Sequence, residues 1–267
     1  MGISVIEQMI VAKSDARACE DAIVVTADFA AVIDGATTPQ FTSENGATGG
    51  FVAAQAIADT ISSLPADADL PTFLTLTAVA ISAAAERSGI PPIFPTAAAA
   101  VISARRREVW VIGDVYTSIT GVAPTKQIER QAIIERVRVV SASLADGARP
   151  EDIQRHDPGR DAIQELLDEQ VTHRNVASDP VGYAALAATP PPPHMCVLAE
   201  IPADAEEVIL ASDGYPEVAT TLAETERLLA TDLASDPLRI GTHAATKAVM
   251  NGATSFDDRA YLRVRLD

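Results

Sequence analysis

The sequence predicts an α+β fold in which two antiparallel β-sheets pack face to face and helices flank the sandwich on both sides. Strand-like segments come in runs, and helix-like segments come in pairs between those runs. Several strand-like segments are joined by links short enough for hairpins. This pattern favours antiparallel sheets covered by helices over the strict strand-helix alternation of a doubly wound fold.

The first third of the chain predicts three strands followed by two helices. Residues 6–11, 22–27 and 29–34 are rich in β-branched side chains and are separated by Asp-Ala and Ala-Asp turns. In residues 46–64 and 70–89, apolar side chains recur every three or four positions, and Gly or Pro marks the ends. These two segments are therefore predicted helices.

The remainder of the chain predicts further strands, further helices and two surface loops. Strands are expected at 97–103, 108–112, 116–121, 195–201, 207–211 and 259–266, with a hairpin turn at 105–107. Helices are expected at 162–174, 221–233 and 237–250, and polar, turn-rich loops at 141–160 and 176–194. Because the first and last strands would share one core, residues 1–267 are expected to form a single domain.

The composition excludes several classes of function. With 37 acidic and 20 basic residues the formal charge is −17, so the average surface repels nucleic acid and anionic lipid, and neither is expected as a partner. Cys19 and Cys196 lie far apart, which predicts neither a disulfide framework nor a zinc site. No leader-like pattern occurs at the N-terminus, and no apolar run reaches the roughly 18 residues of a membrane span. A cytoplasmic location is expected.

Acidic residues stand at the ends of apolar strands in four places. Asp34 ends FAAVID, Asp114 ends VWVIGD, Asp213 follows VILAS, and Asp257 precedes the last strand. Side chains alternate between the faces of a strand, so an acid just beyond a buried run lies at the rim of its sheet, where it can meet others. Each Asp-Gly pair alone is more typical of a turn than of a ligand.

Taken together, these acids predict a site for divalent cations. Carboxylates gathered at one rim repel one another unless cations neutralise them. Oxygen ligands without nearby His or Cys favour Mg²⁺ or Mn²⁺. Gly35, next to Asp34, can turn sharply and offer its backbone carbonyl to an ion. Two such ions, roughly 3.5–4 Å apart, can activate a water for attack on a phosphoryl group.

The order of these acids resembles a known family. The motifs are Glu20-Asp21, Asp34-Gly35, Gly113-Asp114, Ser212-Asp213-Gly214 and Asp257-Asp258. In order, spacing and strand context they are similar to those of the metal-dependent protein phosphatases, the type 2C (PPM) serine/threonine phosphatases, in the form found in bacteria. The resemblance covers nearly the whole chain. The fold of that family, a β-sandwich flanked by helices, agrees with the fold predicted above.

The resemblance implies a role for each acid. Asp34 would bridge two Mg²⁺ or Mn²⁺ ions, and Asp213 and Asp257 would complete one of the two sites. Glu20 and the Gly35 carbonyl would serve the other site. The substrate would be a phosphorylated protein, and water activated between the ions would attack its phosphoserine or phosphothreonine directly.

Other positions are less determined by the resemblance. Asp114 resembles the ligand of a weaker third ion. Arg17 lies three residues before the glutamate, where the family often has an arginine four before it, so it either holds the substrate phosphate or is a surface arginine. Asp21 and Asp258 are either direct ligands or outer partners of the ligands. Ala36 replaces the histidine of animal members, so water would protonate the leaving group.

Two other functions are weighed against the phosphatase. A phosphatase-like module that binds metal or a partner without turnover would explain the displaced Arg17, and the Val115-Tyr116 pair where the family has serine-arginine. Nucleotide binding through NGATGG at 45–50 would use the anion preference of helix N-termini. That segment lacks the GK[ST] of a P-loop and does not match GxGxxG, so a simple entry into a helix is favoured. The sequence does not indicate an oligomeric state.

Overall fold

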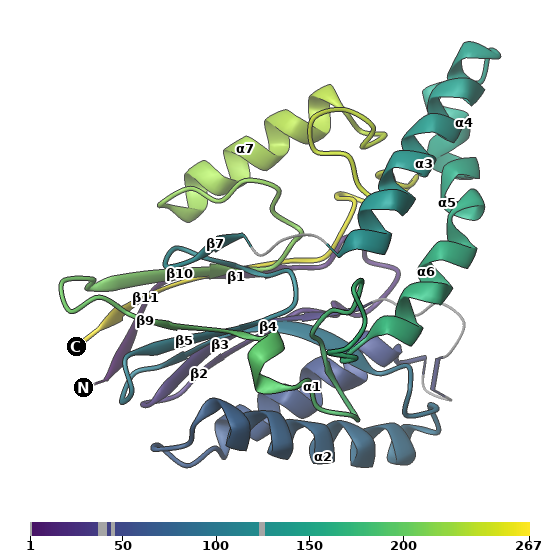
Figure 1. Ribbon diagram of the computed structural model, residues 1–267. Helices are drawn as coiled ribbons and strands as arrows, with labels where there is room; N and C mark the ends of the chain where they lie inside the picture. Colours follow the sequence, from purple (N-terminus) through teal and green to yellow (C-terminus); the bar gives the residue numbers. More distant parts are fainter. Residues whose placement is uncertain (1, 37–41, 44–45, 123–125) are drawn as a thin grey trace.

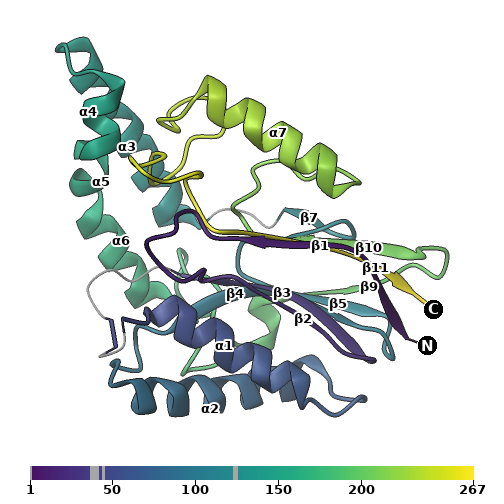
Figure 2. The same ribbon diagram turned by 180° about the vertical axis from the view of Figure 1, so that it is seen from behind.

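Two antiparallel sheets lie face to face in the computed structural model, which describes residues 2–36, 42–43, 46–122 and 126–267 (Figure 1). Helices α1 (Gly49–Ser62) and α2 (Leu70–Ser88) cover the outer face of one sheet. Helix α7 (Leu222–Ser235) covers the outer face of the other, as the reverse view also shows (Figure 2). The predicted sandwich with helices on both sides is confirmed.

The first and last strands are neighbours in one sheet. Within the described residues, its order is β1–β11–β10–β6–β7, and the order of the other sheet is β2–β3–β4–β5–β9, with β8 paired to β4. Strand β1 pairs antiparallel with β11 from Ile3↔Leu266 to Val11↔Arg259. The strands span Ile3–Val11 (β1), Ala22–Val25 (β2), Phe29–Gly35 (β3), Thr96–Ser103 (β4), Glu108–Ile112 (β5), Tyr116–Thr117 (β6), Gly121–Val122 (β7), Leu186–Ala187 (β8), Val197–Glu200 (β9), Glu207–Ala211 (β10) and Arg259–Leu266 (β11).

The alternation along β3 divides the core into two layers. Ala30 and Val32 pack against the opposite sheet. Phe29 and Ile33, one position out of phase, pack with α1 and α2. Because the period is two, Asp34 continues the face of Ala30 and Val32. The strand therefore delivers this carboxylate to the rim of the space between the sheets.

A column of helices stands at the end of the sandwich away from the chain termini (Figure 1). It comprises α3 (Gln127–Ala145), α4 (Pro150–Arg155), α5 (Pro158–Ala162), α6 (Gln164–Gln170) and a 3₁₀ turn at Val171–His173. The loop predicted at 141–160 is wrong, because this stretch holds the end of α3 and two short helices. The sequence pattern did not predict helix α3, because one of its buried positions is the charged Arg136. This residue interrupts the apolar spacing of Ile128, Ala132 and Val140.

The segment 237–250 is irregular, so the helix predicted there is wrong. The backbone carbonyls of Leu238, Arg239 and Ala245 accept hydrogen bonds from the Arg136 guanidinium at 2.8–3.0 Å. These carbonyls therefore accept from the buried Arg136 side chain of α3 and not from backbone N–H groups of a helix in their own segment. The apolar residues of the segment still pack inward, since Leu238 and Ala248 join a small core with Val140.

The remaining differences are small. The strand predicted at 116–121 is a hairpin of two short strands, β6 and β7. The helix predicted at 162–174 is shorter and is α6 followed by the 3₁₀ turn. The loop at 176–194 carries only β8 and the start of a second 3₁₀ turn, Pro193–Met195. Across the described ranges, no helix has the length and apolar character needed to cross a bilayer.

Candidate functional site

Strand register brings the acids of both sheets to the same end of the sandwich. Asp21 precedes β2 and Asp258 precedes β11, each in phase with side chains that face the opposite sheet. Ser212 follows β10 in the same phase, and its hydroxyl donates to Asp21 Oδ2 at 2.6 Å. This bond links the two sheets at Asp21, an acid close enough to Asp34 to repel its carboxylate. The predicted convergence of acids at one rim is therefore present in the fold.

A cavity of about 660 Å³ lies between this end of the sandwich and the column of helices. Asp34, Gly35, Asp114, Asp213 and Asp257 all line it. The column and the segment before β11 contribute Lys126, Glu129, Arg160, Gln164, Arg174 and Lys247 among the other lining residues. The fold thus places most of the predicted ligand positions around one space.

Asp34 and Asp213 are neighbours in this cavity. The backbone N–H of Asp213 points to Asp34 Oδ2 at 3.4 Å, and neither carboxylate belongs to an ion pair among the described residues. Burial, together with repulsion from nearby acids, raises the pKa of Asp34 well above its ordinary value. Enclosure in the cavity, then Asp34 and Asp257, raise the pKa of Asp213. Asp213 keeps contact with solvent, so water screens part of this repulsion.

Asp257 and Asp114 differ from this pair because lysines already neutralise them. Lys13 Nζ lies 3.1 Å from Asp257 Oδ1, and Lys247 Nζ lies 2.6 Å from Asp257 Oδ2. Burial would raise the pKa of Asp257, but the two ammonium groups hold it below its ordinary value. Asp114 Oδ2 pairs with Lys126 Nζ at 2.7 Å. Charge in the site is therefore uneven, with two compensated acids and two uncompensated ones.

Glu20 lies behind the cavity wall and is 4% exposed. Its Oε1 accepts a hydrogen bond from the Thr48 hydroxyl, and its Oε2 is 3.5 Å from Lys13 Nζ. Its backbone carbonyl accepts from the Gly35 N–H at 3.2 Å. A Cβ on Gly35 would lie 2.5 Å from the carbonyl oxygens of Glu20 and Gly50, so glycine is required here by close packing, whether or not its carbonyl binds an ion.

The fit of a divalent cation differs between the two halves of the site. Asp34 and Asp213 line one cavity, are joined by the 3.4 Å contact from the Asp213 N–H, and form no ion pair among the described residues, so their carboxylate oxygens suit Mg²⁺ or Mn²⁺. Glu20, Asp114 and Asp257 each face an ammonium group. Considering only residues 2–36, 42–43, 46–122 and 126–267, no group of three or more His, Cys, Asp or Glu side chains is arranged to hold a metal. The full ligand set remains a prediction.

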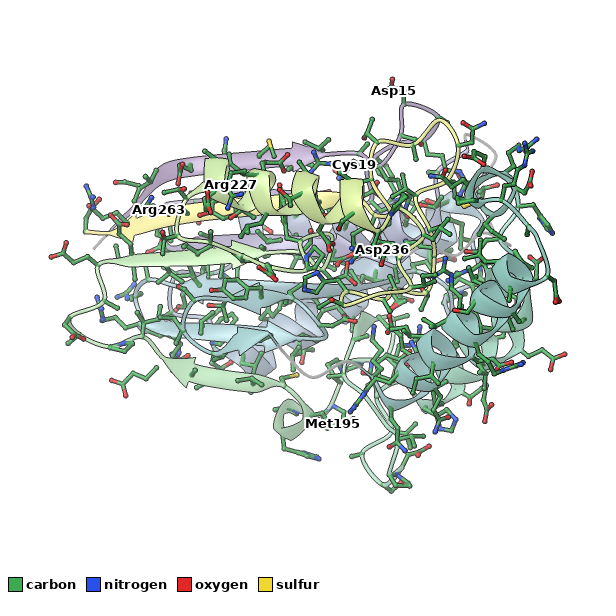
Figure 3. The ribbon with its side chains drawn as sticks, turned by 90° about the horizontal axis from the view of Figure 1, so that it is seen from above. Asp15, Cys19, Met195, Arg227, Asp236 and Arg263 are labelled. Carbon is green, nitrogen blue, oxygen red and sulfur yellow. The ribbon has the colours of Figure 1, made fainter. Side chains whose placement is uncertain are left out.

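Arg17 does not line the cavity. It lies exposed in the loop between β1 and β2, and Figure 3 shows Asp15 at the outer tip of this loop, pointing away from the molecule. Its role in phosphate binding remains a prediction that the cavity geometry does not support. Arg160 lines the cavity instead, and its Nη1 donates to the Thr246 carbonyl at 3.3 Å. Sequence reasoning missed Arg160 because it is the last residue of the stretch 141–160, which was interpreted as a loop.

Gly214→Ala is expected to destabilise the fold by about 1–3 kcal/mol, the usual range for overpacking a filled site. A Cβ at Gly214 would lie 2.0 Å from the Asp258 carbonyl oxygen and 2.8 Å from Arg259 Cβ. The loops that carry Asp213 and Asp257 would have to separate. Urea unfolding measures the effect, and Gly2→Ala is the control, because its Cβ meets only Asp267 Oδ2 at 3.8 Å. Equal unfolding midpoints for the two variants would contradict the close packing.

Comparison with solved structures identifies the fold. The serine/threonine phosphatase PstP/Ppp of Mycobacterium tuberculosis matches over the full length of both chains, with 15% identity and a TM-score of 0.51. RsbX in complex with magnesium matches at 14% identity (99% of this chain, 100% of that one, TM-score 0.48). The PPM phosphatase MsPP of Mycobacterium smegmatis, in complex with cacodylate, matches at 18% identity (99% and 100%, TM-score 0.46).

At 15% identity, the match to PstP/Ppp establishes a shared fold and not a shared activity. The resemblance inferred from the acidic motifs is therefore confirmed at the level of fold. No protein-family model matches this chain, and no curated protein matches it either.

Proposed function

We propose that this chain hydrolyses phosphoserine and phosphothreonine monoesters in proteins, with Mg²⁺ or Mn²⁺ held by Asp34 and Asp213. One observation carries the proposal: the backbone N–H of Asp213 lies 3.4 Å from Asp34 Oδ2, both residues line one cavity, and neither carboxylate has a cation partner among the described residues. The fold shared with PstP/Ppp, a serine/threonine phosphatase, supports it. Residues 1–267 act as one catalytic domain in this proposal.

The cation, when bound, supplies Lewis acidity toward phosphoryl oxygens and lowers the pKa of water. The chain itself supplies positive charge for the phosphate dianion. Arg160 and Lys247 both line the cavity, and the bond from Arg160 to the Thr246 carbonyl sets them on adjacent segments. Arg160 is partly desolvated, which lowers its pKa and strengthens its attraction to an anion in the cavity.

The residues of the cavity wall also determine how the leaving group can be protonated. Ala36 lines the cavity, as does the Asp114–Lys126 pair, which is fixed by its 2.7 Å contact. An alanine cannot donate a proton, so solvent protonates the serine or threonine alkoxide in this proposal. The formal charge of −17 is unfavourable for nucleic acid and anionic membranes, which leaves a phosphorylated protein as the expected partner.

We expect phosphate release from p-nitrophenyl phosphate and from phosphoserine and phosphothreonine peptides only when Mn²⁺ or Mg²⁺ is present. Initial rates with metal, with EDTA, and with metal restored after EDTA measure the dependence. Activity that persists unchanged in EDTA would contradict a metal-dependent mechanism. A phosphotyrosine peptide serves as the comparison substrate for specificity.

A second function, metal or partner binding without turnover, is favoured by the lysines on Asp114 and Asp257. These ammonium groups neutralise acids that the phosphatase hypothesis assigns to divalent metal ions. In this alternative, calorimetry detects Mn²⁺ binding, while no substrate in the assay above releases phosphate. The same purified chain thus decides between the two functions.

A further inference from the structure

The chain contains three lysines, and all three form ion pairs with acids of the candidate site. The three are Lys13, Lys126 and Lys247, whereas the sequence has seventeen arginines, of which Arg160 and Arg174 also line the cavity. Lys126 pairs with Asp114, while Lys13 and Lys247 pair with Asp257. An ammonium is a compact point charge with three donors, whereas a guanidinium is a broad planar fork. Lysine is therefore the basic side chain that best fits a small cage of oxygens.

Lys13 lies within such a cage. Its Nζ is 3.1 Å from Asp257 Oδ1, 3.5 Å from Glu20 Oε2 and 3.6 Å from Asp258 Oδ2. Its side chain is 18% exposed. Burial lowers the pKa of Lys13, but the three carboxylates raise it further, and the amine remains charged. Oxygens from two distant segments thus surround a single positive charge.

The backbone holds Lys13 in place at two points. Its N–H donates to Asp258 Oδ1 at 2.8 Å, and its carbonyl accepts from the Thr254 N–H at 2.8 Å. The side chain therefore enters the cage from an anchored residue and not from a free loop. Asp258 also accepts from the Glu20 N–H at 2.9 Å, so the same carboxylate fixes both the cation and one of its partners.

Lysines engage both oxygens of Asp257. Lys13 is on Oδ1, and Lys247 is on Oδ2 at 2.6 Å. A second divalent ion at Glu20 and the Gly35 carbonyl would have to displace Lys13 from Glu20 Oε2, and any ion that used Asp257 would meet the repulsion of Lys13 and Lys247. Asp34 and Asp213 carry no such obstacle, because neither forms an ion pair within the described part of the chain.

We propose that the ammonium group of Lys13 takes the place of one divalent cation, so that the chain binds a single Mg²⁺ or Mn²⁺, at Asp34 and Asp213. This inference rests on the proposed function for the presence of that one ion. It replaces the expectation of two ions and a weaker third. Lys13 contributes a fixed positive charge that needs no metal from solution, and Lys247 completes the neutralisation of Asp257.

Calorimetric titration of the metal-free full-length chain with MnCl₂ tests the inference. We expect one ion per wild-type chain and two per Lys13→Met chain, because methionine keeps the apolar side chain as far as Cε, lacks the ammonium group, and so frees Glu20 Oε2, Asp257 Oδ1 and Asp258 Oδ2. Lys13→Arg keeps a positive charge and is expected to bind one ion. Arg17→Met is the matched control, since it removes one positive charge from the same loop outside the cage, and it too is expected to bind one.

The outcomes separate the inference from the proposed function. Two ions per wild-type chain, or a stoichiometry unchanged in Lys13→Met, would overturn the role of Lys13, whatever the activity. One ion in the wild type, two in Lys13→Met and no phosphate release from any substrate would overturn the phosphatase and leave the role of Lys13 supported. If Lys13→Met folds only with Mn²⁺, its stoichiometry is measured by elemental analysis after gel filtration, with the same two values expected. No ion in the wild type would overturn both proposals.

Discussion

Asp213→Asn is expected to lower kcat/KM for manganese-dependent phosphate release by at least about 100-fold, since even outer partners of metal ligands cost 10–100-fold when removed. The amide retains the shape of the side chain but loses the negative charge that would hold the cation beside Asp34. Initial rates with p-nitrophenyl phosphate at saturating Mn²⁺ measure the change. Asp15→Asn is the matched control, because that carboxylate lies exposed at the loop tip (Figure 3). Full activity of Asp213→Asn would end the metal-dependent proposal.

A rise in melting temperature would show that this variant has lost chemistry and not its fold. The pKa of Asp213 is raised in the folded protein by enclosure in the cavity and by Asp34 and Asp257. Between the ordinary carboxyl pKa of about 4 and the raised value, the folded state keeps a proton that the unfolded chain has released. Stability of the metal-free protein therefore falls as the pH rises through this window. The neutral amide removes that loss, so metal-free Asp213→Asn should melt above the wild type at mildly alkaline pH.

The sequence was sufficient to predict where the acids meet, because a short-range rule decides it. A carboxylate at the end of a buried strand must lie at the rim, and the period of two fixes its face. Asp34 follows this rule directly, in phase with Ala30 and Val32. The order of the two sheets and the pairing of β1 with β11 then bring distant segments to one end. The alternation of side chains along each strand, together with the predicted sandwich fold, therefore explains why acids line the cavity.

The positive charges of the site could not be predicted in the same way. Lys13 lies in a polar loop. Lys247 lies in a segment whose apolar spacing predicts a helix but whose backbone is irregular. Nothing in the sequence around Lys126 or Arg160 marks either residue as facing Asp114 or the cavity. Their positions depend on how the column of helices docks on the sandwich, which is a tertiary property. The neutralisation of the acids was therefore visible only in three dimensions.

Arg136→Met is expected to destabilise the fold by about 3–5 kcal/mol, the cost of leaving one member of a buried ion pair without its partner. Arg136 is fully buried, and its Nε donates to Asp157 Oδ2 at 2.8 Å. Its guanidinium also donates to three backbone carbonyls of the segment that carries Lys247. Methionine fills much of the space but satisfies none of these acceptors. Urea unfolding monitored by far-ultraviolet circular dichroism measures the loss.

Arg138→Met is the control on the same helix, because Arg138 pairs with Glu135 on the exposed surface and should leave the unfolding midpoint close to that of the wild type. The double variant Arg136→Met/Asp157→Asn should recover part of the stability, since it removes the unpaired charge. An asparagine at 157 can still accept from the Gly159 and Arg160 N–H groups at the start of α5. Equal loss in the single and double variants would show that the carbonyl acceptors, and not Asp157, set the cost.

Because of the position of Arg136, the Arg136→Met variant tests function as well as stability. One guanidinium joins α3 to the start of α5, which carries Arg160, and to the segment 237–250, which carries Lys247. If the helical column positions the cations for phosphate, Arg136→Met should raise KM for a phosphopeptide at temperatures where the variant is still folded. Calorimetric Mn²⁺ binding should persist, because Asp34 and Asp213 lie on the sandwich. A parallel loss of metal binding and substrate binding would indicate that the column supports the whole site and not only its phosphate-facing wall.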